Sequence, residues 1–152
     1  MRTPQWIKKL GGHAGELYVA AELSKRGIPN ALLPENFSDD DVMAGGKDEM
    51  RLCFIQVKSC HPDRSQSFIL RAAQEQWEGA AENQFVVFVW LGSPGKNESP
   101  QFWVARKHDV GAACRRHPAH GTSNWERRFK ARNLPPEWQN AWQAIESYVT
   151  ST

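Results

Sequence analysis

The segment CFIQVKSC (residues 53–60) has the apolar pattern of a β-strand, yet Gln56 and Lys58 stand in its middle. Side chains alternate between the two faces of a sheet, so these two leave the same face, about 6.5 to 7 Å apart along the strand. Ile55 and Val57 point to the opposite face. An amide and an ammonium group on an otherwise core-like strand indicate either a solvated face or a chemical site.

Two carboxylates are expected near this pair. Asp41 lies at the start of a second predicted strand within DDDVMAGG (residues 39–46), and the stretch from Asp41 to Lys58 has the form of a β-hairpin, which would bring Asp41 close to Gln56. Glu16 lies in GELYVAAELSKRG (residues 15–27), a predicted amphipathic helix that ends at a glycine, and it shares the stripe of the apolar residues. A carboxylate on a buried stripe costs free energy unless another group pairs with it.

Oxygen ligands of this kind suit Mg²⁺, which usually takes one or two carboxylates and keeps several waters. Asp41 and the carbonyl oxygen of Gln56 could supply ligands, and Glu16 could add a second carboxylate, directly or through water. Lys58 beside such a cation could orient the attacking water or offset charge that develops on a phosphate. One Mg²⁺ site beside a lysine that acts on water would account for all four residues together.

The remaining elements indicate how these residues are positioned. Strands are expected within residues 28–34, 39–46 and 50–60, and briefly at 67–70; after a helix at 71–83, the apolar run at 85–92 predicts a central strand covered on both faces. Residues 101–106 predict an edge or near-edge strand, 108–117 a short helix, and the segment from residue 118 onward one or two helices broken at Pro135 and Pro136. This order predicts an α/β fold with a mixed sheet in one domain, residues 1–152, with a core at about 11–110 and a helical basic and aromatic tail at about 111–152.

Three motifs carry a family resemblance: GELYVAAEL with Glu16, DDVMAGG with Asp41, and FIQVKS with Gln56 and Lys58. In these motifs and in the strands that follow them, residues 11–110 resemble the PD-(D/E)xK nuclease superfamily. The resemblance implies a three-layer α/β/α restriction-endonuclease-like core, similar to that of Holliday-junction resolvases, and DNA endonuclease activity. It further implies Mg²⁺ ligands at Asp41 and Gln56, a water-activating role for Lys58, and completion of the metal site by Glu16.

The sequence departs from the family pattern at two positions. No proline precedes Asp41, and its neighbours Asp39 and Asp40 could compete for the ligand role, although DVMA resembles the family's acidic-then-apolar strand start. Gln56 stands where the family usually has a glutamate, so the site has one negative charge fewer and metal affinity depends more on Glu16 and Asp41. The alternative is therefore a catalytically inactive nucleic-acid-binding or protein-interaction module on the same scaffold, because a fold does not prove an activity.

Each residue also has a local explanation. Glu16 could stabilise a helix start through the dipole, Asp41 could form a turn, and Gln56 with Lys58 could belong to a solvated edge. One metal site accounts for all four, which favours it. An accessory protein that acts only with a partner subunit is a third interpretation. The spacing of Cys114, His117 and His120 is not a usual zinc pattern, so that group is expected to be surface structure.

Charge indicates the partner. The net charge is only +2, but the segment 115–132 is strongly basic, with Trp125 and Phe129 interleaved, as suits a phosphate backbone. A solvated helix face explains the same composition equally well. The residues predicted to bind nucleic acid are Arg64, Arg115, Arg116, Arg127, Arg128, Lys130 and Arg132.

The remaining features concern the setting. No apolar run approaches the roughly 20 residues of a membrane span, and the N-terminal segment lacks the apolar region of a secretory signal. Three cysteines without a CxxC pair predict reduced thiols, so we expect a cytoplasmic protein that does not contact membranes. Cutting both strands of a duplex generally needs two sites, which makes a homodimer the expected assembly.

Overall fold

The computed structural model describes residues 3–35, 39–64, 67–71, 77–117 and 126–151 of the 152-residue chain. Its α-helices are α1 (Gln5–Lys25), α2 (Lys107–Arg116) and α3 (Gln143–Thr150), and its short 3-10 helices include η2 (Pro94–Lys96), η3 (Ala131–Asn133) and η4 (Pro136–Trp138). The strands are β1 (Asn30–Leu32), β2 (Val42–Gly45), β3 (Leu52–Cys60), β4 (Ser67–Arg71), β5 (Gln84–Trp90), β6 (Gln101–Arg106) and β7 (Glu126–Lys130). None of the helices in these ranges is long and apolar enough to cross a bilayer.

The main sheet has the order β1-β2-β3-β5-β6 and is mixed. β3 and β5 pair in parallel, from Phe54 opposite Gln84 to Cys60 opposite Trp90, and the other neighbours pair antiparallel. The continuously apolar β5 is buried over its five middle residues, which confirms it as an inner strand covered on both faces. β6 forms one edge, as its sequence predicted.

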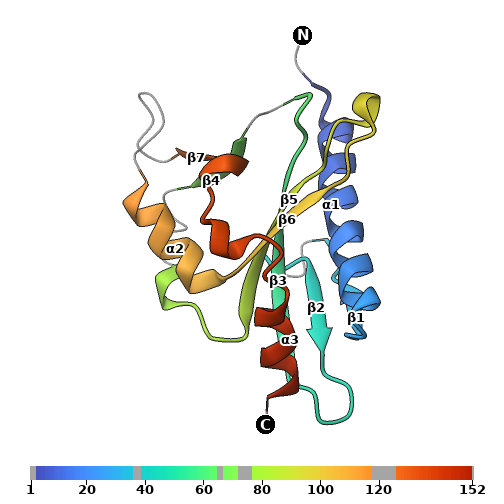
Figure 1. Cartoon of the computed structure of the whole chain (residues 1–152), viewed down its shortest axis with the longest axis vertical. Coiled ribbons are helices and arrows are strands. Elements are labelled where there is room, and N and C mark those ends of the chain that lie inside the picture. Colours follow the sequence, from blue (N-terminus) through green and yellow to red (C-terminus); the bar gives the residue numbers. More distant parts are fainter. Residues whose placement is uncertain (1–2, 36–38, 65–66, 72–76, 118–125, 152) are drawn as a thin grey trace.

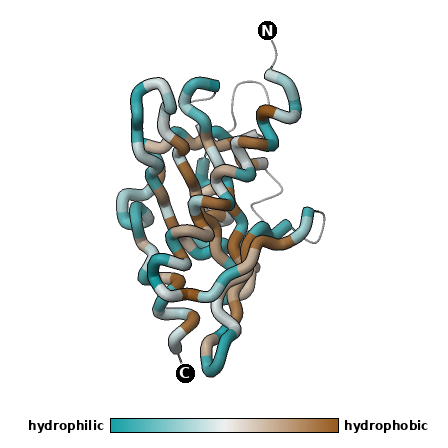
Figure 2. The backbone as a smooth tube through the Cα atoms, turned by 90° about the vertical axis from the view of Figure 1, so that its right-hand side faces the viewer, coloured by the Kyte–Doolittle hydropathy of each residue, from teal (hydrophilic) through white to brown (hydrophobic). Residues whose placement is uncertain are grey.

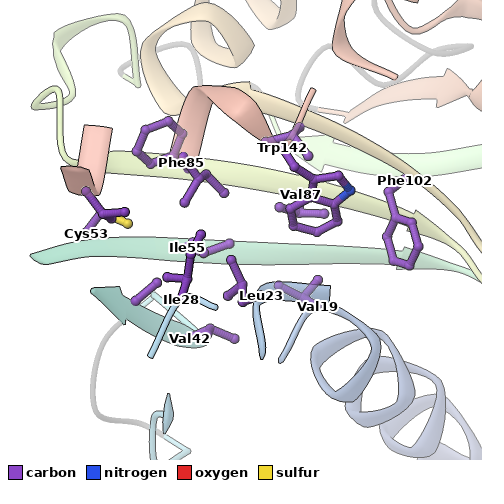
Figure 3. Close-up of a cluster of buried hydrophobic side chains, with 14 of the residues drawn as sticks. Val19, Leu23, Ile28, Val42, Cys53, Ile55, Phe85, Val87, Phe102 and Trp142 are labelled. Atoms are coloured by element: carbon purple, nitrogen blue, oxygen red, sulfur yellow. The ribbon is translucent and has the colours of Figure 1, made fainter. Parts of the chain in front are cut away.

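Two apolar clusters cover the two faces of this sheet. On one face, α1 and α3 pack against the odd-numbered residues of β3, with Val19, Leu23 and Ile145 among the buried side chains. Figure 3 shows several of these side chains converging between the helices and the strands. On the other face, α2 and the two-stranded sheet β4–β7 pack against Val86 and Phe88. In Figure 1, α1 and α2 accordingly lie on opposite sides of the strands.

The arrangement confirms the expected α/β class with a mixed central sheet and helices toward both ends of the chain. Apolar segments gather in the strands at the centre of the molecule, and hydrophilic ones lie in the surrounding turns (Figure 2). Cys53 and Cys60 belong to clusters on opposite faces, and all three cysteines are free, as the alternation of β3 predicted.

The first helix is longer than its sequence indicated. A helix over residues 15–27 was predicted, but α1 begins at Gln5. The early start is not evident from the sequence because this part of α1 contains Gly11, Gly12 and Gly15, and each glycine disfavours a helix by about 1 kcal/mol relative to alanine. At Gly15 the missing side chain is required: a Cβ there would collide with Ser59 Oγ and lie 3.4 Å from Val57 Cγ1. The glycine lets α1 approach β3 closely.

The C-terminal segment differs from the prediction of helices alone. Residues 126–130 form β7, which pairs antiparallel with β4, with Phe129 opposite Phe68. Arg127 and Phe129 are buried, and Arg128 and Lys130 are exposed, so the strand alternates although most of its residues are charged. The helix predicted at 71–83 is wrong where the structure describes that range, because Arg71 ends β4, residues 77–79 form a 3-10 turn and residues 80–83 are not helical. Residues 72–76 of that prediction, with Ala73, and residues 118–125 of the predicted tail, with His120 and Trp125, lie outside the described residues.

Candidate active site

Asp41 is fixed at the edge of β3. The pairing of β2 with β3 ends at Val42 and Ile55, and Asp41 immediately precedes it. The Asp41 backbone N–H donates to Ile55 O at 2.9 Å, and its Oδ2 accepts the Val57 N–H at 2.7 Å. Asp41 O accepts the Leu33 N–H at 2.9 Å on the side of β1. The Asp41 carboxylate thus accepts a hydrogen bond from a backbone N–H of β3 that lies beyond the end of its pairing with β2.

Glu16 reaches the same place from α1. It follows Gly15, whose contact with Ser59 and Val57 sets the helix against β3. The carboxyl groups of Glu16 and Asp41 share a hydrogen bond. A helix and a strand edge, far apart in sequence, therefore place two carboxyl groups in contact.

This contact changes the acidity of both groups. Burial, then the charge of Asp41 and their hydrogen bond, raise the pKa of Glu16 from 4.5 to about 7, with a further contribution from Glu35. Burial also raises the pKa of Asp41, but the Val57 N–H, the hydrogen bond with Glu16 and the Lys58 ammonium oppose that rise. Without a cation, the proton shared by the pair therefore resides on Glu16 near neutral pH.

Lys58 approaches Asp41 from the other face of the sheet. α1 covers Val57 and Ser59, whereas the Lys58 side chain extends toward Trp77, with Nζ 6.0 Å from the ring centroid. Trp77 packs against the cluster on the α2 face, and Lys107 Nζ lies 4.9 Å from the same centroid. The Trp77 ring thus contacts both the core and the predicted catalytic lysine.

Gln56 is the third predicted ligand of the cation, through its side-chain amide oxygen. It lies in β3 between the two residues that hydrogen-bond Asp41, and only 9% of its surface is exposed. Its Oε1 is buried and has no hydrogen-bond partner among the described residues. A buried amide oxygen without a partner costs about 1 to 3 kcal/mol unless a ligand satisfies it. This orphaned acceptor lies on the strand to which Asp41 is hydrogen-bonded, and an amide oxygen of this kind can coordinate a cation.

The donor set favours a hard cation. Within the described ranges, no group of three or more His, Cys, Asp or Glu side chains could hold a metal ion. Glu16, Asp41 and Gln56 offer two carboxylates and one amide oxygen instead, and Mg²⁺ is commonly bound by so few protein ligands because it retains waters. The residues present therefore fit Mg²⁺ better than they fit zinc.

The contacts also separate Asp41 from its acidic neighbours. Asp39 is exposed, and the charge of Asp40 raises the pKa of Asp41. Asp41 is hydrogen-bonded both to β3 and to Glu16. The geometry favours it as the ligand.

A cleft of about 660 Å³ opens over the two carboxyl groups, and we call it the carboxylate cleft. It is lined by Lys9, Leu10, Gly12, His13, Glu16, Leu32, Leu33, Pro34, Glu35, Asp40 and Asp41. His13 Nδ1 lies 3.9 Å from Glu16 Oε2. Because α1 begins at Gln5, His13 lies within the helix, one turn before Glu16, and lines the same cleft.

The predicted nucleic-acid-binding residues do not form one surface. Arg115 binds Glu78 through Nε at 2.6 Å and Nη2 at 3.0 Å, and Arg127 is buried. Arg116 and Arg132 line separate hollows, and Lys130 is exposed on β7. Arg64 and Arg128, by contrast, line one pocket beside α1.

The cysteine and histidine residues near α2 have structural roles. Cys114 is buried, and His117 Nε2 lies 2.8 Å from Arg128 O. The His117 ring stacks on Phe129 with centroids 4.1 Å apart. Cys114 therefore belongs to the core and not to the surface structure that was predicted, and His120 lies outside the described residues.

Comparison with known proteins supports the fold. No protein-family model and no curated protein matches the sequence. The structure is similar to that of a bacterial homing endonuclease, I-Ssp6803I, with a TM-score of 0.53 and 16% sequence identity over 90% of this chain and 91% of that chain. The likeness extends over nearly the whole of both chains, so it includes the C-terminal segment as well as the predicted core.

Proposed function

We propose that this protein is a Mg²⁺-dependent DNA endonuclease whose active site is formed by Glu16, Asp41, Gln56 and Lys58. The observation that carries the proposal is the contact between the Glu16 and Asp41 carboxyl groups at the edge of β3, the strand that also carries the unsatisfied Gln56 oxygen. Structural similarity to a DNA-cutting enzyme supports the same class of activity.

Each residue has a defined task. Asp41 and Gln56 would hold Mg²⁺, and Glu16 would complete the site once it has lost its proton. When bound, Mg²⁺ supplies Lewis-acid stabilisation of the charge that develops on the phosphate and lowers the pKa of water. Lys58, held on the opposite face of β3, would orient the attacking water and stabilise negative charge.

The partner in this proposal is DNA. A homodimer would present two such sites to the two strands of a duplex, and sedimentation or light scattering on DNA can test this assembly. Mn²⁺ should replace Mg²⁺, because both are bound by oxygen ligands. The cytoplasm, where thiols stay reduced, is the proposed compartment.

Incubation with supercoiled plasmid and Mg²⁺ or Mn²⁺ tests the activity. The wild type should nick or linearise the plasmid, Asp41→Ala should not, and EDTA should stop the reaction. Lys58→Ala should bind DNA as the wild type does, and its cleavage rate should be lower by a factor of about 100 or more. Normal cleavage by Lys58→Ala or Asp41→Ala would refute the assignment.

The second candidate is a nucleic-acid-binding or interaction module without catalysis, and Gln56 in place of an acidic residue is the feature that favours it. The two proposals differ in one result. A module would bind DNA equally well in EDTA and in Mg²⁺ and would leave the plasmid intact at every metal concentration.

A further inference from the structure

A second cavity, of about 530 Å³, lies beside the carboxylate cleft, and Gly12 lines both. We call it the basic pocket. Its walls come from the start of α1, the end of β3 and the loop after it, the segment after β5, and the two strands of the β4–β7 sheet. We propose that the basic pocket binds a backbone phosphate of DNA near the phosphate that is cut, a proposal that rests on the proposed function.

The charge of the pocket supports an anionic ligand. Lys8, His61, Arg64 and Arg128 line it, and no acidic side chain does so among the residues that the structure describes. These four residues come from three separate parts of the chain, so the concentration of positive charge is produced by the fold. In a concave site with apolar walls, grouped cations attract phosphate more strongly than they would on an open surface.

Two of the cationic side chains are positioned by contacts. Arg64 Nη1 lies 3.8 Å from the place where a Gly11 Cβ would be, so the guanidinium group rests against the glycine surface of α1. His61 Nδ1 accepts the Asp63 N–H at 3.2 Å, which leaves Nε2 to carry the proton in the neutral ring. Both groups are therefore donors, and a guanidinium can bind two phosphate oxygens at once.

The apolar part of the pocket suits a sugar next to the phosphate. Ile69, 44% exposed on β4, and Leu91 line the same cavity as the cationic groups. A nucleic-acid strand presents a phosphate and an apolar sugar edge in turn, whereas free phosphate would leave these side chains in water. The combination favours the backbone of a polymer over a free anion.

The position of the pocket relates it to the proposed chemistry. Lys8 and Gly12 precede Glu16 by two turns and one turn of α1, or about 12 and 6 Å along the helix axis. A DNA strand advances about 3.4 Å per nucleotide, so a phosphate in the pocket would lie about two to four nucleotides from the one at Glu16. Gly12 lines both cavities, and a Cβ there would meet nothing within 4 Å.

Duplex binding in EDTA, where no metal-dependent cleavage occurs, tests the pocket directly. Arg64→Ala and Lys8→Ala should each weaken binding about tenfold and lower the slope of log Kd against log salt concentration by about 0.9. Lys47→Ala is the matched control, because Lys47 is equally exposed but lies in the turn between β2 and β3. It should bind as the wild type does, and loss equal to that of Arg64→Ala would overturn the proposal.

Two further measurements identify the ligand. In a duplex with one neutral methylphosphonate, the position that occupies the pocket should weaken binding of the wild type but not of Arg64→Ala. If inorganic phosphate instead binds with an Arg64-dependent affinity while duplex affinity is unchanged, the pocket is a free-anion site and the proposal is wrong. Arg64-dependent duplex binding by a wild type that cuts no DNA would retain the phosphate pocket and refute the nuclease.

Discussion

The Glu16 carboxyl group on α1 is hydrogen-bonded to the Asp41 carboxyl group at the edge of β3. Both are partly buried, and Asp41 also receives the Val57 backbone N–H and lies near the Lys58 ammonium. The proton of the pair is consequently retained by Glu16 up to about neutral pH. A divalent cation that binds both carboxylates would displace that proton. Folding raises the pKa of Glu16, and this higher pKa in turn lowers metal affinity at acidic pH.

The first prediction concerns the pH dependence of stability without metal. The pKa of Glu16 is raised from 4.5 to about 7, so between these values the folded state holds more protons than the unfolded state, and the free energy of unfolding falls as pH rises. The contribution of Glu16 is complete below its unfolded pKa and is lost by the time pH exceeds about 7. Urea unfolding in EDTA at several pH values measures this decline.

Replacing Glu16 by glutamine tests the source of that decline. Glu16→Gln keeps a donor toward Asp41 and cannot ionise, so the decline between pH 4.5 and 7 should flatten. Glu137→Gln, which removes an exposed carboxylate on η4, should keep the wild-type profile. If both variants retain the full decline, Glu16 does not hold the proton.

The second prediction concerns Gln56. Because its Oε1 is buried without a partner among the described residues, Gln56→Met should be neutral or should raise the free energy of unfolding by about 1 kcal/mol. The same variant should weaken Mg²⁺ binding, since it removes an oxygen ligand. Gln56→Glu should do the reverse: a third buried acid destabilises the metal-free protein at pH 8 and tightens Mg²⁺.

Calorimetric Mg²⁺ titration and urea unfolding distinguish these outcomes. If Gln56 is a metal ligand, the free energy of unfolding and the Mg²⁺ affinity should change in opposite directions in each variant. A Gln56→Met protein that is less stable and binds Mg²⁺ normally would show that the amide is a structural group.

The third prediction concerns Trp77 as a positioning residue. Its ring lies 6.0 Å from Lys58 Nζ, and a cation–π contact contributes about 0.5 to 2 kcal/mol. Trp77→Leu should therefore lower kcat about 2- to 30-fold with KM unchanged, and Trp77→Phe should recover part of the loss. Trp90→Leu removes a half-buried indole from the same cluster, and it should affect the unfolding midpoint but not kcat. Equal kcat losses in both leucine variants would assign Trp77 a packing role alone.

The sequence predicted those parts of the fold that depend on local patterns. β5 was found because both of its faces are covered, so its apolar run is continuous. The hairpin from Asp41 to Lys58 followed from alternation in β3 and the glycine turn before it, and that hairpin places Asp41 beside Gln56. Strand alternation also separated Cys53 from Cys60.

The missed features depend on distant partners. In β7, Arg127 and Phe129 point inward. In the sequence alone, a segment with so many charges is typical of an exposed helix face. Only the pairing with β4 identifies it as a strand, because strand propensity depends on context. The true start of α1 was hidden by three glycines, of which Gly15 is required for the close contact with β3. The local sequence likewise does not indicate that His13 lies near Glu16 or that Trp77 lies near Lys58, because each contact depends on a neighbour on another turn or another element.

The last prediction concerns the glycine surface of α1. A Cβ at Gly12 would meet nothing within 4 Å, whereas one at Gly15 would collide with Ser59 Oγ and lie 3.2 Å from Ser59 Cβ. Gly12→Ala should therefore stabilise the helix by about 1 kcal/mol, and Gly15→Ala should destabilise the protein by about 1 to 3 kcal/mol through overpacking. Because α1 carries Glu16, displacement of the helix in Gly15→Ala should also weaken Mg²⁺ binding. The double variant Gly15→Ala/Ser59→Ala removes the colliding hydroxyl and should recover part of both losses. If Gly15→Ala gains stability as Gly12→Ala does, the helix does not approach β3 as closely as the Glu16–Asp41 contact requires.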